Sequence, residues 1–90
     1  MNLDTLREQV DGINKEIVTL IAERLEITKE IGKIKALHGL SITDIARESH
    51  QLTQLMEMAK ELQISPFIIE QVFNVIVEYS KLMMKLEQTA

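Results

Sequence analysis

The feature that most limits how this chain can fold is an apolar repeat that starts at Leu3 and continues to Ile34. Apolar residues recur at intervals of three and four, with a single gap, at Leu3, Leu6, Val10, Ile13, Ile17, Leu20, Ile27, Ile31 and Ile34. This spacing predicts one α-helix with a seam like that of a coiled coil. Asp4 is placed to cap its start and Gly39 is its first stop signal, so we expect roughly 34 residues and a length of about 50 Å.

A helix of this length cannot be covered by its own chain. A compact domain of 90 residues has a radius of gyration of only about 12 Å, so one end of the helix must extend past the core. The apolar seam continues along the extended part, and leaving it in water would be costly and would favour aggregation. The sequence therefore predicts an obligate dimer in which the long helices cover each other.

Two shorter helices are predicted to follow the long one. The first begins with Thr43 or Asp44 as its N-cap, and the second has Ser65 as N-cap with Pro66 at the first helical position. The seam of the first is Ile45, Leu52, Leu55, Ala59 and Leu62, and the stripe of the second is Ile69, Val72, Phe73, Ile76, Tyr79 and Met83. Connections this short usually join neighbouring packed helices. We expect an all-α fold of three helices in a single domain that covers residues 1–90.

Composition excludes several classes of function. The net charge is −4, from 10 Lys and Arg against 14 Asp and Glu, and no basic run offers a surface for nucleic acid. No cysteine is present, and His38 and His50 do not have the spacing of metal ligands, so neither a metal nor a cofactor is expected. The N-terminus does not resemble a signal peptide and no apolar run has membrane-spanning length, so we expect a soluble cytoplasmic protein.

Two charged residues stand where the repeat requires an apolar one. Arg24 fills the gap in the first helix, and Glu48 fills a gap in the second. A buried charge without a partner is costly, so each needs either a protein partner or a ligand. Lys35 lies three turns after Arg24 on nearly the same face, and Ser80 places a hydroxyl beside the apolar stripe of the third helix.

Two interpretations fit these polar residues. In the first, Arg24 and Glu48 form a buried pair that specifies helix register, while Lys35, Asp44 and Arg47 lie at a solvated helix end. In the second, the same side chains line a pocket for a small anion. Taken one residue at a time, the spacing favours the first interpretation.

Over nearly its whole length the sequence resembles the small all-helical (type II) chorismate mutases. The resemblance is carried by "LREQVDGINKEIVTLIAERLEITKEIGKIK", "ITDIARE" and "VFNVIVEYS". These stretches hold an early Leu-Arg, an Arg after the apolar stretch, Ile-Gly-x-x-Lys, Asp-x-x-Arg-Glu and a Ser late in the last helix. The resemblance implies an intertwined homodimer of three-helix subunits. It also implies an isomerase that converts chorismate to prephenate in phenylalanine and tyrosine biosynthesis.

The resemblance further implies that cations hold the two carboxylates of the substrate. It assigns Arg7 and Arg24 to the carboxylates, and Lys35 to the ether oxygen and a carboxylate. Arg7 and Arg24 are about 26 Å apart along one helix and roughly 100° apart around it, so they cannot hold one small dicarboxylate from the same chain. In the family the first Arg comes from the other subunit, and we expect Arg7 to do the same.

The remaining roles implied by the resemblance lie around the substrate ring. Asp44 and Glu48 would surround the ring hydroxyl, and Arg47 and Ser80 would support the carboxylate side. A Claisen rearrangement is unimolecular and pericyclic, so it needs no nucleophile, proton relay or cofactor, only a substrate held in a reactive conformation. An ammonium at Lys35 would stabilise the charge that grows on the ether oxygen, so the expected catalytic residues are Lys35, Arg24 and Glu48.

Two residues depart from the family pattern. Met84 occupies the position of a Gln that donates a second hydrogen bond to the ether oxygen, and a thioether cannot donate. Gln88 lies about 6 Å further along the helix, and Lys81 stands where the family usually has an apolar pocket residue. These changes leave open weaker catalysis or a related enzyme, such as isochorismate pyruvate lyase or aminodeoxychorismate mutase. A non-catalytic helical dimerisation or regulatory module is a further alternative.

Overall fold

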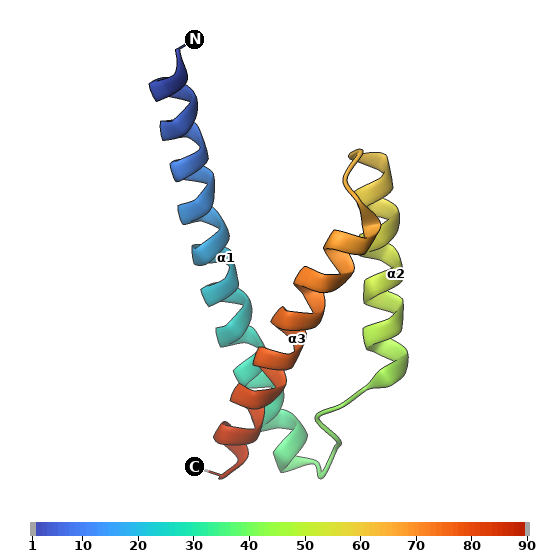
Figure 1. Ribbon diagram of the computed structural model, residues 1–90. Helices are drawn as coiled ribbons and strands as arrows, with labels where there is room; N and C mark the ends of the chain where they lie inside the picture. The colour runs from blue at the N-terminus through green and yellow to red at the C-terminus, as the bar shows by residue number, and fades with distance from the viewer. Residues whose placement is uncertain (1, 90) are drawn as a thin grey trace.

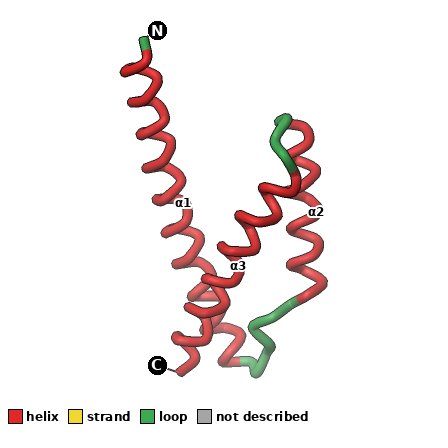
Figure 2. Tube along the Cα trace, in the orientation of Figure 1, coloured by secondary structure: helices red, strands yellow, loops and turns green. Residues whose placement is uncertain are grey.

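The computed structural model describes residues 2–89, and all regular structure in that range is helical (Figures 1 and 2). The three helices are α1, Leu3–Leu37; α2, Ile45–Glu61; and α3, Pro66–Thr89. This confirms the prediction of an all-α chain with one very long N-terminal helix and two shorter ones. At 35 residues, α1 has nearly the predicted length.

The prediction that Asp4 caps α1 is wrong, because the helix begins earlier. The Asn2 side chain accepts a hydrogen bond of 2.8 Å from the Thr5 N–H, which is the usual geometry of an N-cap residue. Asp4 lies instead in the first turn, where a carboxylate interacts favourably with the positive end of the helix dipole. The predicted stop is confirmed, since α1 ends two residues before Gly39, whose φ of 64° is in the left-handed region.

The other two helix starts agree with the sequence signals. Asp44 is the N-cap of α2 and accepts a hydrogen bond of 3.1 Å from the Arg47 N–H. Ser65 accepts one of 3.4 Å from the Ile68 N–H, and Pro66 is the first residue of α3. Since proline has no N–H to leave unpaired, it suits this first position.

Helix α3 packs against both of the other helices, whereas α1 and α2 are not packed against each other (Figure 1). The C-terminal part of α1 crosses the C-terminal part of α3, and the N-terminal part of α1 extends away from both shorter helices (Figure 1). The radius of gyration is 16.3 Å, against about 12 Å for a compact chain of this length. The predicted projection of α1 is therefore confirmed.

The face of α1 that packs on α3 shares with the predicted seam only Arg24, the residue that fills the gap in the apolar repeat. It consists of the partly or fully buried residues Ile21, Arg24, Leu25, Thr28, Lys29, Gly32 and Lys35. The nine apolar seam residues from Leu3 to Ile34 all stay between 42% and 63% exposed. Helix α1 thus has two faces, one used within the chain and one left uncovered by it.

The inward faces of α2 and α3 differ in part from the predicted stripes. On α2, Leu52, Leu55 and Ala59 are turned inward as predicted, but Ile45 and Leu62 at its two ends are exposed. On α3, Ile69, Phe73, Ile76 and Met83 are partly buried as predicted, whereas Val72 and Tyr79 are nearly half exposed. The most buried side chains of α3 are Ser80 and Met84, which lie against α1 and line the smaller of the two cavities described below.

Helices α1 and α3 approach each other closely at Gly32. A methyl group added at Gly32 would lie 2.8 Å from Met84 Cγ and 3.0 Å from its Cβ, which is closer than carbon atoms tolerate. Because these atoms are near the backbone of α3, they cannot move aside as a side-chain tip could. The absence of a side chain at Gly32 is what allows Met84 to be buried here.

We predict that Gly32→Ala destabilises the protein. Alanine favours a helix over glycine by about 1 kcal/mol, but overpacking a close contact costs about 1–3 kcal/mol. The matched control is Gly12→Ala on the same helix, where nothing lies within 4 Å of the added methyl, so the helical gain should remain. Urea unfolding of the two variants should therefore give shifts of opposite sign. A stabilising Gly32→Ala would contradict the close contact.

Candidate active site

A small cavity of about 120 Å³ lies among the C-terminal part of α1, the start of α2 and the C-terminal part of α3. Six of the seven site residues predicted from the sequence line it: Arg24, Lys35, Asp44, Arg47, Glu48 and Ser80. The seventh, Arg7, does not, because it belongs to the projecting half of α1. The fold therefore brings together residues that are up to 56 positions apart in the sequence.

Arg24 is held by Ser80. Its Nη1 donates a hydrogen bond of 2.8 Å to Ser80 Oγ, and the hydroxyl in turn donates one of 3.0 Å to the Ile76 carbonyl. Ser80 is only 5% exposed, so these two hydrogen bonds fix one edge of the Arg24 guanidinium against α3. A guanidinium carries five N–H donors, and those not used by Ser80 remain available for a bidentate contact with a carboxylate.

Lys35 lies at the other end of the cavity and is anchored to the loop before α2. Its Nζ donates a hydrogen bond of 3.0 Å to the Ile42 carbonyl. An ammonium has three donors, so this contact orients Lys35 while leaving two donors for a ligand. Asp44 also lines the cavity, although its Oδ1 is engaged as the cap of α2.

Glu48 pairs with Lys81 and not with Arg24. The Lys81 Nζ lies 2.7 Å from Glu48 Oε1, and the hydrogen bond between them raises the pKa of Lys81 above its usual value. The buried Arg24–Glu48 pair that the spacing favoured is therefore wrong. The two residues do not pair because each has a partner on α3: Arg24 donates to Ser80, and Glu48 forms an ion pair with Lys81.

The balance of charge suits an anion with two charges. Four cationic side chains (Arg24, Lys35, Arg47 and Lys81) and two carboxylates line the small cavity, which gives it a net charge of +2. Ligand pockets for small molecules usually have about 300 Å³ or more, so the small cavity by itself is tight. It shares Arg24, Glu48, Gln51, Val77 and Lys81 with an adjacent cavity of about 590 Å³. The two cavities together offer room for a ring-containing dicarboxylate. Because Glu78 lines the larger cavity, their combined lining carries a net charge of +1, with the excess of cations in the small cavity.

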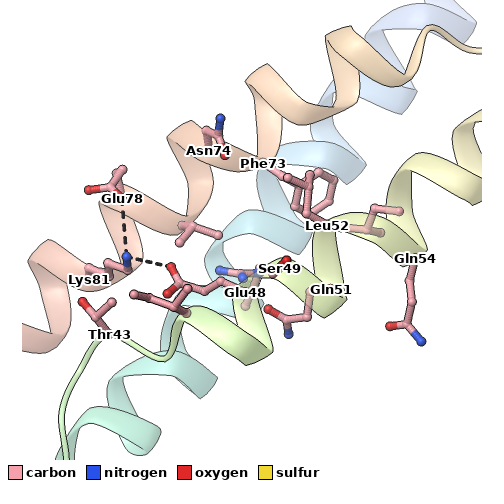
Figure 3. Close-up of a pocket in the computed structure, with 14 residues that line it drawn as sticks. Thr43, Glu48, Ser49, Gln51, Leu52, Gln54, Phe73, Asn74, Glu78 and Lys81 are labelled. Atoms are coloured by element: carbon pink, nitrogen blue, oxygen red, sulfur yellow. Dashed lines mark ion pairs between the residues drawn. The ribbon is translucent and has the colours of Figure 1, made fainter.

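The larger cavity lies between α2 and α3 (Figure 3). Leu52 and Phe73 line its apolar part, and the Glu48–Lys81 pair stands at its polar end (Figure 3). Such an arrangement, with an apolar wall beside a few charged groups, is typical of a small-molecule site.

The two departures noted in the sequence occupy different positions. Met84 is 7% exposed and lines the small cavity, so a thioether stands at the position of the family's Gln. Gln88 is exposed and lines neither cavity, so no amide on that turn replaces it. Among the described residues, the polar side chains that line the small cavity are charged groups and hydroxyls, and Gln51 is the one side-chain amide there.

Several lining residues were missed by the sequence analysis. Thr28 and Val77 border the small cavity, and each lies one helical turn from a predicted site residue, Arg24 and Ser80 respectively. That spacing could have identified them. The Ile42 carbonyl had no such signal, because a backbone oxygen in a loop is placed only by the path of the chain.

The described residues, 2–89, contain neither a candidate metal site nor a helix suited to cross a membrane. No group of three or more His, Asp or Glu side chains in this range could hold a metal ion. No helix in the same range combines the length and apolar character needed to cross a membrane.

Comparison with known proteins agrees with this geometry. Residues 6–85 match the family model of chorismate mutase type II. The chorismate mutase of Methanocaldococcus jannaschii is 32% identical over 89 residues, which cover 97% of this chain and 90% of that protein. The T-protein of Enterobacter agglomerans is 36% identical over 72 residues, and the bifunctional chorismate mutase/prephenate dehydratase of Escherichia coli K12 is 34% identical over 77 residues. The matches cover 80% and 86% of this chain, but only 19% and 20% of those two longer proteins. With the six polar residues gathered in one cavity, these matches show that the chain belongs to the chorismate mutase type II family.

Proposed function

We propose that this chain catalyses the Claisen rearrangement of chorismate to prephenate, a step towards phenylalanine and tyrosine. The observation that carries the proposal is the cavity of net charge +2 that contains Arg24, Lys35, Arg47 and Glu48. The family description and the names of the relatives favour this activity over isochorismate pyruvate lyase and aminodeoxychorismate mutase. A purely structural role for the charges is less well supported, because Arg24 and Glu48 do not pair to set helix register.

The reaction breaks the ether C–O bond and forms a C–C bond within one molecule, with no proton or group transferred. The protein must therefore select a chair-like conformation and stabilise the charge that develops as the C–O bond breaks. Arg24, fixed by Ser80, is suited to hold a carboxylate bidentately. Lys35 supplies an ammonium for the ether oxygen, and since it is already oriented by the Ile42 carbonyl, little reorganisation is needed.

The proposed enzyme is a homodimer. A single chain exposes 7118 Å², whereas a compact monomer of 10.3 kDa exposes about 5,400 Å². The uncovered seam on α1 contributes to this difference, and a second α1 is apolar along the same length. We propose that the two long helices cover each other's seams and that residues 1–90 form one domain that acts in the cytoplasm.

The dimer also completes the site. Arg7 lies about 26 Å along α1 from Arg24 and lines neither cavity of its own chain. If the N-terminal half of α1 crosses the partner subunit, Arg7 reaches the partner's cavity and binds the second carboxylate. Each dimer then has two sites, each built from one chain's cavity and the other chain's Arg7.

The test of this function is incubation of the purified protein with chorismate, followed by the loss of its diene absorbance and identification of prephenate. Isochorismate and aminodeoxychorismate serve as comparison substrates. Turnover of chorismate to prephenate supports the proposal. No loss above the uncatalysed rate, from a protein shown to be folded and dimeric, would exclude it.

We predict that Met84→Gln raises kcat. The variant keeps a side chain of similar length against Gly32 and replaces the sulfur by an amide that can donate to the ether oxygen. A hydrogen bond to a charged or charge-developing group corresponds to about tenfold in rate or more. The control is Met58→Gln, which alters an exposed methionine on α2 and should leave kcat unchanged. An unchanged kcat in a folded Met84→Gln protein would show that residue 84 does not face the ether oxygen.

A further inference from the structure

Lys81 is the one cation of the small cavity to which neither the sequence spacing nor the family resemblance gave a role, since the family usually has an apolar pocket residue at this position. It projects from α3 between two carboxylates, with its Nζ 2.7 Å from Glu48 Oε1 and 3.6 Å from Glu78 Oε1 (Figure 3). The side chains of Lys81 and Glu48 are 18% and 27% exposed, whereas that of Glu78 is 73% exposed. Glu78 lines only the larger cavity, whereas the shorter and better shielded contact, with Glu48, lies where the two cavities meet.

The ion pair with Lys81 neutralises the carboxylate of Glu48 inside the site. A carboxylate with no cation beside it would repel a dianion in the cavity. Without Lys81, the net charge of the small cavity would fall from +2 to +1. Glu48 also lines both cavities, so a substrate that occupies them passes beside this carboxylate. Lys81 lines both cavities as well, and it offsets the charge of Glu48 at the place where a dianion would meet it.

The contact also orients Glu48. Lys81 engages Oε1, and a carboxylate has a second oxygen that can accept a hydrogen bond independently. Glu48 is near the start of α2 and Lys81 is on α3, so the contact also fixes the carboxylate relative to Arg24, which Ser80 holds from the same helix. The free oxygen can then accept from a hydroxyl on the substrate ring.

We propose that Lys81 is a positioning residue of the substrate site, which holds Glu48 by one carboxylate oxygen and offsets its charge, so that the other oxygen binds the ring hydroxyl of a dianionic substrate. This inference rests on the proposed function for the identity of the substrate. It adds a residue that the family pattern does not supply, because an apolar side chain at this position could neither hold nor neutralise Glu48.

A double-mutant cycle on the 90-residue chain tests the inference. The wild type, Lys81→Met, Glu48→Gln and the double variant are compared for kcat and KM with chorismate. We expect each single variant to lose about tenfold in kcat/KM, with KM carrying most of the loss for Lys81→Met, and the double variant to be no worse than Glu48→Gln. Lys81→Arg keeps the charge and should retain most of the activity.

The matched control is Lys33→Met. Lys33 makes an ion pair of 3.1 Å with Glu30 on the surface of α1, so the variant removes a lysine from a similar pair away from the cavities. It should change kcat/KM by less than about twofold. Circular dichroism melting of every variant separates loss of positioning from loss of fold, because a structural role would lower stability and spare KM in the folded protein.

Each outcome decides the question. Losses that multiply in the double variant, or full activity of Lys81→Met, would overturn the positioning role. If the wild type binds chorismate without converting it, the proposed function fails and the same four proteins are compared by calorimetry, where non-additive losses in affinity support Lys81 and additive ones overturn it. If the wild type neither binds nor converts chorismate, both proposals are rejected.

Discussion

Lys35→Met will lower kcat for chorismate by about 10²–10³-fold, the loss typical of removing one donor from a preorganised oxyanion site. The reason is that negative charge grows on the ether oxygen only as the C–O bond breaks, so an ammonium there stabilises the transition state more than the bound substrate. Lys35 is already directed by the Ile42 carbonyl, and a neutral side chain can replace neither its charge nor its donors. The measurement is the diene assay at saturating chorismate, where a loss in kcat larger than any change in KM is expected.

The Lys35 prediction has two controls. Lys33→Met, two residues earlier on α1 and on the surface, should leave kcat unchanged. Thermal unfolding of Lys35→Met should show a folded protein, since the lost contact is a single partly buried hydrogen bond. A kcat within about tenfold of the wild type would remove Lys35 from the ether-oxygen site and leave the function without its main electrostatic element.

If the chain forms the proposed homodimer, Arg7→Ala will lose most of its activity, and part of that activity will return when this variant shares a dimer with Lys35→Met. One substrate carboxylate loses its bidentate partner in Arg7→Ala, which should cost about 10²-fold or more in kcat/KM. A mixed dimer has one defective site and one intact site, since the intact site takes its cavity from the Arg7→Ala chain and its Arg7 from the other. Random pairing should restore about a quarter of wild-type activity.

The complementation is measured by unfolding the two variants together in urea, refolding them, and assaying the mixture against each variant refolded alone. Lys15→Ala, on the same projecting half of α1, is the control and should remain active by itself. Recovery on mixing can arise only if the site combines residues of two chains. Two inactive variants that stay inactive after mixing would show that Arg7 acts within its own chain, and an active Arg7→Ala homodimer would show that Arg7 has no role.

Sequence periodicity could predict the helices of this fold and their lengths. The 3.6-residue period reports which positions share a face of a helix, and helix length follows from where stop signals stand. The long α1, its end near Gly39 and the starts at Asp44 and Pro66 were therefore predicted correctly. The resemblance to a family then named six residues that the fold does bring to one cavity.

What periodicity does not report is which neighbour each face meets. The apolar seam of α1 was expected to carry its packing, yet α3 packs on a second face, through Thr28 and Gly32. The contact requires glycine at position 32, because α1 and α3 cross so closely that even a methyl group would collide with Met84. No spacing rule contains the distance between two helices, so this contact could not have been predicted.

The sequence by itself determined the three helices, the excess length of α1 and the set of polar residues that break its apolar pattern, because these depend on neighbours within a few turns of the chain. Only the tertiary structure decided the partners: Arg24 with Ser80, Lys35 with the Ile42 carbonyl, and Glu48 with Lys81. Pairing depends on how helices distant in sequence cross, and a charge is satisfied by whichever donor or acceptor that crossing brings within hydrogen-bonding distance.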